Sequence, residues 1–266
     1  MLRTVNELDE FVVEATDGRI GRLLDFYFDD QFWAVRFLVV KTDDWLADRT
    51  VLISPLAIGR PDASAKALPA AVTREQVRMS PDIDTHKPVS RQHEVENYGY
   101  YGYPFYWGGS GMWGNSTLPA LMLAAQRGDE SAGLTHKQQE FVEAQAAFHR
   151  QRGDDPHLRS CRAISGYHLH ASDGEIGHVE GFVVDDESWA IRYLIVNTSD
   201  WWLGHQVLIA PPWIADISWI DATVSVDLTR QAVKDAPRYD GKTLPDRVRE
   251  RDLHEHYGRA AYWGED

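Results

Sequence analysis

The 266-residue chain contains a single cysteine, Cys161. One cysteine excludes a disulfide within the chain and any zinc site that uses several thiolates. Long apolar runs are also missing, since the longest, LPALMLAA at 118–125, is far shorter than the ~20 residues that span a bilayer. The N-terminus lacks the charged-then-apolar pattern of a signal peptide. We therefore expect a cytoplasmic protein with no membrane insertion.

Positive charge is scarce as well. The chain has 27 Lys and Arg against 41 Asp and Glu, a formal net charge of −14. A nucleic-acid-binding protein needs a basic surface, and the densest basic stretch, RVRERD at 247–252, is mixed with acids. Nucleic acid is therefore not an expected partner.

The motifs of common catalytic sites are absent too. There is no glycine-rich phosphate loop and no GxSxG sequence. The serines, histidines and acids form no arrangement that indicates nucleophilic or acid–base catalysis. We therefore expect no catalytic residues, no cofactor and no enzymatic activity.

The main feature that is present is an internal repeat. Residues 16–55 (TDGRIGRLLDFYFDDQFWAVRFLVVKTDDWLADRTVLISP) align without a gap with residues 172–211 (SDGEIGHVEGFVVDDESWAIRYLIVNTSDWWLGHQVLIAP), at an offset of 156. The register extends to the aromatic segments YYGYPFYWG (100–108) and HYGRAAYWG (256–264). A segment that closes both repeats at one register belongs to the repeating unit, so we expect it to be ordered.

The repeat defines the domain organisation. Each unit has a comfortable size for one core, giving a first domain at 1–108 and a second at 160–266. Between them, 109–159 forms a linker, which begins with the glycine-rich GSGMWGNS and contains a predicted helix at about 135–152. Two similar units on one chain often pack as a homodimer would. We therefore expect an intrachain pseudodimer, with a homodimer of the whole chain as a further possibility.

Within each unit, the pattern predicts a mainly β fold. FVVEA, the turn TDG and RIGRLLDFYF form a hairpin. WAVRFLVV and WAIRYLIV are apolar runs typical of a strand buried on both sides. In the second unit, IADISWIDATVSVDL predicts two further strands, whereas GRPDASAKALPAAV in the first predicts weaker pairing. Two short helices follow in each unit, at TREQV and SRQHEVENY in the first and at TRQAV and DRVRERDLHEHY in the second. Five or six short strands with tight turns indicate a small antiparallel barrel.

The core pattern T/SDGxIG…DD…WxxRxLxVxT…W…VLIxP resembles the PRC-barrel family, which includes the cytoplasmic domain of the photosynthetic reaction-centre H subunit. The resemblance covers roughly residues 10–80 and 165–236. It implies two PRC-like barrels in tandem in a bacterial protein, with docking on larger assemblies. It also implies an alternative role, a peripheral factor in photosynthetic light reactions and electron transfer. The membrane-spanning N-terminal helix of the H subunit has no counterpart in this sequence.

Three polar groups have both a structural and a functional interpretation. Asp17-Gly18 and Asp173-Gly174 have the chemistry of hairpin turns. Asp29-Asp30 and Asp185-Asp186 are expected to be solvated turn acids rather than cation ligands. His168, His170 and His178 lie on one predicted hairpin and are the only candidate metal ligands, although the first unit has Val12, Glu14 and Arg22 at these positions. We predict no metal site there, and a small-ligand or metal-binding protein remains a second alternative.

The aromatic residues provide the leading functional hypothesis. Exposed Trp and Tyr side chains are frequent anchors of protein interfaces. The candidate partner surface comprises Trp45, Trp201, Trp202, Tyr101, Tyr103, Phe105 and Trp107. We therefore predict a non-enzymatic adaptor that binds another protein, and packing of these rings into the core is the competing interpretation.

Overall fold

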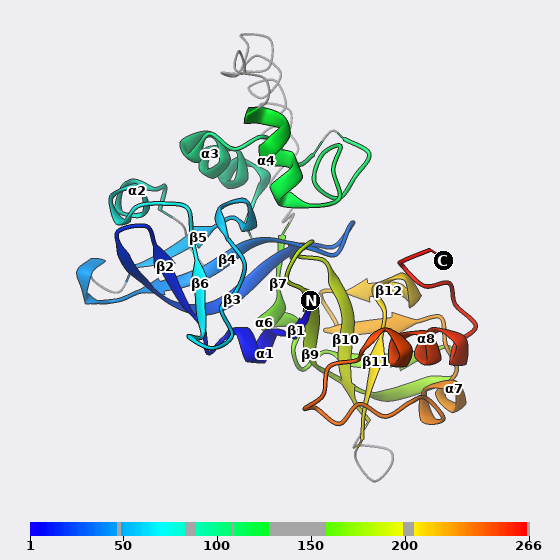
Figure 1. Cartoon of the computed structure of the whole chain (residues 1–266). Coiled ribbons are helices and arrows are strands. Elements are labelled where there is room, and N and C mark those ends of the chain that lie inside the picture. The colour runs from blue at the N-terminus through cyan, green and yellow to red at the C-terminus, as the bar shows by residue number, and fades with distance from the viewer. Residues whose placement is uncertain (47–48, 83–88, 108, 128–157, 199–204, 265–266) are drawn as a thin grey trace. The chain divides into compact units, whose positions relative to one another are not determined.

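The computed structural model describes residues 1–46, 49–82, 89–107, 109–127, 158–198 and 205–264. The predicted linker helix at about 135–152 lies outside these ranges, and so do Trp201 and Trp202. The described chain is mainly β, with two sheets and short helices (Figure 1). No helix among the described residues is long and apolar enough to cross a membrane.

The chain forms two compact units, each described here by itself. The first-repeat unit comprises Glu7–Ser160 and Asp186–Ala190. The second-repeat unit comprises Met1–Asn6, Cys161–Asp185 and Ile191–Asp266. Short segments of each repeat therefore belong to the unit of the other.

The sheet of the first-repeat unit has six strands in the order β5-β4-β3-β2-β6, with β7 paired to β3. These strands are β2 (Val12–Ala15), β3 (Gly18–Asp29), β4 (Ala34–Thr42), β5 (Thr50–Ile53), β6 (Ala67–Pro69) and β7 (Leu158–Ser160). The predicted hairpin is confirmed by β2 and β3. The fully buried strand is confirmed by β4, in which only Lys41 is exposed.

The sheet of the second-repeat unit has seven strands in the order β11-β10-β9-β8-β13-β12, with β1 paired to β9. Its strands are β1 (Leu2–Thr4), β8 (His168–Ala171), β9 (Gly174–Asp185), β10 (Ile191–Asn197), β11 (Gln206–Ile209), β12 (Ile214–Ser218) and β13 (Thr223–Val226). The last two confirm the extra strands predicted for this repeat. The weaker pairing predicted for the first repeat is also confirmed, since the three-residue strand β6 is the one strand in that region.

The sheets are not wholly antiparallel, so that part of the sequence prediction is wrong. β2 pairs with β6 and β8 pairs with β13 in parallel. A parallel pair needs a long crossover connection. Here the intervening strands supply it, β3 to β5 in the first repeat and β9 to β12 in the second. Alternating patterns do not encode strand direction, which explains the error.

A first-strand exchange links the repeats and was not anticipated from the sequence. β1, from the first repeat, pairs with β9 through Leu2↔Asp185. At the same repeat register, β7, from the second repeat, pairs with β3 through Leu158↔Asp29. Each repeat therefore completes its sheet with the opening strand of the other.

In both repeats, a steric constraint explains the glycine of the xIG motif, which is Gly21 in the first and Gly177 in the second. A Cβ built on Gly21 would lie 1.9 Å from the carbonyl oxygen of Lys41, and one on Gly177 would lie 2.0 Å from that of Asn197. Only glycine allows the neighbouring strand to approach this closely.

Short helices follow the strands. In the first repeat they are α1 (Val5–Leu8), α2 (Arg74–Met79) and α3 (Arg91–Tyr101), with short 3₁₀ turns at Asp44–Leu46 and Pro55–Ala57. A further helix, α4 (Pro119–Arg127), lies in the segment predicted as the linker. In the second repeat the helices are α6 (Cys161–Ile164), α7 (Arg230–Lys234) and α8 (Arg247–His256), with a 3₁₀ turn at Pro211–Trp213. The sequence predicts α2, α3, α7 and α8, and these four helices are confirmed. In each repeat, the second of these two helices, α3 or α8, leads directly into the aromatic segment and positions it.

Candidate functional site

The aromatic segment of the first repeat is folded around one buried ring. Tyr98, on α3, is fully buried and packs edge-on against Phe37 at a ring-centroid distance of 5.7 Å. The residues after the helix then surround it, with Tyr103 at 6.0 Å and Trp107 at 5.8 Å. Such aromatic pairs contribute beyond their buried area. The segment is therefore ordered, as its repeat register predicts.

The backbone reversal that brings these rings together occurs at Gly102. This residue ends α3 in the left-handed region, at φ 68°. The amide of Tyr103 then donates a hydrogen bond to the carbonyl oxygen of Tyr98, at 2.9 Å. A glycine at this position is the usual end of a helix that turns back on itself.

The predicted surface residues of this segment lie in a half-buried shell. Tyr101, Tyr103, Phe105 and Trp107 are each partly exposed. Tyr101 and Tyr103 stack at 5.4 Å, and Phe105 lies 4.6 Å from Trp107. Their rings thus have one face on the unit and leave part of their area to solvent.

A polar cluster that no sequence pattern predicted lies beneath this shell. Arg36 donates from Nε to Asp29 Oδ2 at 2.6 Å, and both side chains are almost fully buried, at 0% and 1% exposure. Tyr106 donates to Glu94 Oε1 at 2.5 Å. Arg91 Nη1 lies 3.1 Å from both the Tyr106 hydroxyl and Glu94 Oε2. Two arginines therefore offset two buried carboxylates.

The electrostatics of Glu94 are unusual for a carboxyl group. Burial raises its pKa from 4.5 to about 7, and the nearby guanidinium of Arg91 and the hydroxyl of Tyr106 oppose this increase only in part. A buried acid of this kind can hold a proton near neutral pH. It lies inside the unit, where it holds α3 and the aromatic segment together.

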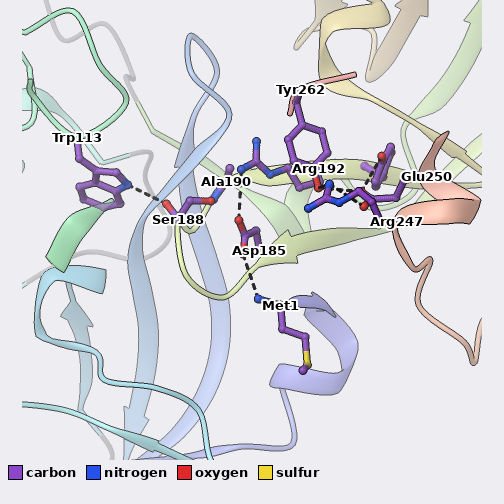
Figure 2. Close-up of polar contacts among 10 residues, drawn as sticks. Met1, Trp113, Asp185, Ser188, Ala190, Arg192, Arg247, Glu250 and Tyr262 are labelled. Carbon is purple, nitrogen blue, oxygen red and sulfur yellow. Dashed lines mark hydrogen bonds and ion pairs between the residues drawn. The ribbon is translucent and has the colours of Figure 1, made fainter. Parts of the chain in front are cut away.

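Trp113 covers the cluster from the glycine-rich stretch at 109–116. The guanidinium of Arg36 lies 3.7 Å from the Tyr106 ring centroid and 4.6 Å from that of Trp113, a cation–π arrangement. Trp113 is fully buried, and its Nε1 donates to the carbonyl oxygen of Ser188 at 2.8 Å (Figure 2). This part of the predicted linker is therefore packed against the first-repeat unit.

The second repeat has the same cluster at the same register, 156 residues later (Figure 2). Arg192 lies 3.3 Å from Asp185 and 4.0 Å from the Tyr262 ring centroid. Tyr262 donates to Glu250 Oε1 at 2.8 Å, and Arg247 Nη1 lies 3.0 Å from Glu250 Oε2. The cluster is thus a duplicated element of the fold that fixes the aromatic tail of each unit.

The turn acids differ from their predicted role. The Asp-Gly positions are confirmed as hairpin turns, but Asp17 also accepts a hydrogen bond from the amide of Arg74 at 2.8 Å, and Asp173 accepts one from Arg230 at 2.7 Å. The expectation that Asp29 is solvated is wrong. The residue is buried because Arg36 offsets its charge.

The three candidate metal-ligating histidines do not converge with other ligands. His168 and His178 face each other across the β8–β9 pair, and His168 Nδ1 lies 2.9 Å from Glu175. His170 is instead opposite Glu175 in the register. Among the described residues, no group of three or more His, Cys, Asp or Glu side chains is arranged to hold a metal ion.

Trp45, the remaining predicted surface residue with a described position, is half-buried in its loop. Its Nε1 donates to the carbonyl oxygen of Ile20 at 2.7 Å, and the guanidinium of Arg74 lies 4.2 Å from its ring centroid. These contacts hold the side chain against its own unit.

Comparison with known proteins assigns this chain to no family. No protein-family model matches this chain, and no curated protein matches it.

Proposed function

We propose that the protein is a non-enzymatic adaptor built from two PRC-like barrels, which binds another protein through the aromatic surface of its first repeat. We define this aromatic surface as Tyr100, Tyr101, Tyr103, Phe105 and Trp107.

Barrel closure of each sheet is part of this proposal. Two observations support it. The long strands β3 and β9 each contain register shifts against their neighbours, at Leu23/Asp25 in β3 and opposite Ile195/Val196 for β9. Such bulges increase the bend and twist of a strand. The long strands are also bonded on both sides, which a curled sheet requires.

The observation that carries the functional proposal is the difference between the two aromatic tails. The second repeat has His256, Arg259 and Ala261 where the first has Tyr100, Tyr103 and Phe105. It keeps the polar cluster and the helix nonetheless. The fold therefore forms without aromatic rings at these positions, and a role at the surface accounts for their presence in the first repeat.

The form of the aromatic surface suits an interface anchor. Tyr100 is 40% exposed, yet its hydroxyl donates to the carbonyl oxygen of Gln76 at 2.8 Å. The neighbouring rings of Tyr101 and Tyr103 are stacked. Rings held in place before binding lose little conformational entropy on contact, which favours affinity. The net charge of −14 disfavours nucleic acid as the partner.

The test exchanges residues between the repeats. Tyr100→His and Tyr103→Arg install the residues that the second repeat tolerates. The tagged wild-type chain should retain a defined protein partner from an extract of its native host. Each variant should reduce capture about tenfold or more while the unit stays folded, as circular dichroism would verify.

The matched control is His256→Ala, because the Nε2 of His256 contacts the carbonyl oxygen of Ala232 as Tyr100 contacts Gln76. This variant should capture the partner normally. Equal capture by wild type and both tyrosine variants would contradict the proposal, as would the absence of any retained protein.

A further inference from the structure

The aromatic tails of the two repeats share their polar framework but differ in what lies beside it. In the first repeat, the rings of Tyr98, Phe105 and Trp107 fill this space, with Phe105 at 6.2 Å from Tyr98 and 4.6 Å from Trp107. The equivalent residues of the second repeat are His254, Ala261 and Trp263. Only the tryptophan is retained, so two rings are replaced by smaller side chains.

The second repeat has a cavity at this position. Its volume is about 570 Å³, within the usual range of small-ligand sites. It is formed by α8, drawn in red in Figure 1, and by the tail that follows the helix. Its lining includes Arg251, His254, Arg259, Ala260, Ala261 and Trp263.

One wall of the cavity is aromatic and fixed. Trp263 lies 5.4 Å from His254, and the guanidinium of Arg247 lies 4.2 Å from the Trp263 ring centroid. His254 is buried, with Nδ1 3.0 Å from the carbonyl oxygen of Ala260 and Nε2 3.1 Å from the Tyr193 hydroxyl. A planar ring entering the cavity would therefore meet surfaces that are already ordered.

The cavity also has two arginines in its lining that the first repeat lacks. Arg251 and Arg259 replace Val95 and Tyr103, while Glu255 is the single acid in the lining. Arg259 is anchored by Asp227, at 2.9 Å. Arg251 is exposed and makes no hydrogen bond or ion pair with any residue that the structure describes. It is therefore available to an anion.

We propose that this cavity binds a small aromatic carboxylate. The ring occupies the space that Phe105 fills in the first repeat, against Trp263, and the carboxylate pairs with Arg251. This site is separate from the aromatic surface proposed above, and its function as a ligand site does not depend on that proposal.

The test uses the full chain and three probes in calorimetric titrations. Indole-3-acetate has both the ring and the carboxylate, indole has only the ring, and acetate has only the carboxylate. We expect indole-3-acetate to bind with a dissociation constant between about 10 μM and 1 mM, at least tenfold more tightly than indole, and acetate not to bind measurably. Absence of binding by indole-3-acetate, or equal binding by indole, would overturn the proposal.

Two variants of the second repeat each install the residue found at the equivalent position of the first repeat. Ala261→Phe should abolish binding by filling the cavity, and Arg251→Val should weaken it about tenfold. Arg249→Val is the matched control, since it removes the same charge from the same helix but lines a different cavity of about 320 Å³. Unchanged affinity in Ala261→Phe, with its fold verified by circular dichroism, would overturn the site. A loss of affinity in Arg249→Val equal to that in Arg251→Val would overturn the specific role of Arg251.

Discussion

The polar clusters of the two repeats contain the same residue types at the same register, but they are buried to different degrees. In the first repeat, Tyr106 is 4% exposed beneath Trp113 and the aromatic shell. In the second, the equivalent Tyr262 is 37% exposed, and both partners of the Arg192–Asp185 pair are 19% exposed. One duplicated framework therefore supports a closed tail in the first repeat and a more open tail, with a cavity, in the second.

The polar framework of each repeat is therefore separable from the surface side chains that pack on it. The hydrogen bonds from Tyr106 to Glu94 and from Tyr262 to Glu250 are preserved. The residues that rest on them are not, because Phe105 is replaced by Ala261. The preserved contacts explain the common fold. The side chains that differ form the two proposed sites, the aromatic surface of the first repeat and the cavity of the second.

The largest loss of stability is expected when the buried ion pair of the first repeat is broken. Arg36→Met leaves Asp29 buried without its partner, which should lower stability by about 3–5 kcal/mol. Arg192→Met removes the equivalent and more solvated arginine of the second repeat, and should cost about 1 kcal/mol or less. Urea unfolding of both variants measures the difference. Equal losses would show that burial does not distinguish the two clusters.

The next effect concerns pH. Because burial raises the pKa of Glu94 to about 7, the folded unit keeps a proton that the unfolded chain releases near pH 4.5. The contribution to stability is therefore present below about pH 4.5 and is lost as the pH rises to about 7, by roughly 3 kcal/mol in all. Glu94→Gln should remove this dependence.

Urea midpoints between pH 5 and pH 8 measure this effect. Glu96→Gln, on the exposed side of α3, is the control and should keep the wild-type slope because it retains Glu94. If the curves of wild type and Glu94→Gln run parallel over this range, the proton is not held at Glu94.

Much of the fold can be predicted from the sequence, for physical reasons that particular elements show. The gapless repeat sets the register, and the turn at Asp17-Gly18 closes the first hairpin. The run at 34–40 is apolar apart from Arg36, a pattern typical of a buried strand. The strand exchange could not be predicted in this way. β1 and β7 have three residues each, too few to show a pattern, and their pairing partners lie far away in the sequence.

The candidate site was only partly predictable. The aromatic run is visible in the sequence, and the repeat register indicates that it is ordered. The polar cluster has a sequence signal in retrospect, because Arg91 and Glu94 recur as Arg247 and Glu250. Such charged residues on a short helix usually face solvent, so the sequence alone did not indicate their burial. The cavity depends on the packing of side chains at Ala261 and His254, which no pattern encodes.

The most direct test of the two-repeat account compares Phe105→Ala with Ala261→Phe in urea unfolding without any ligand. Phe105→Ala removes a packed but partly exposed ring and should cost about 2 kcal/mol. Ala261→Phe fills a space that is already open and should change stability by less than about 1 kcal/mol. If Ala261→Phe is destabilised by about 1–3 kcal/mol, as an overpacked core would be, the second repeat has no open cavity and the account is contradicted.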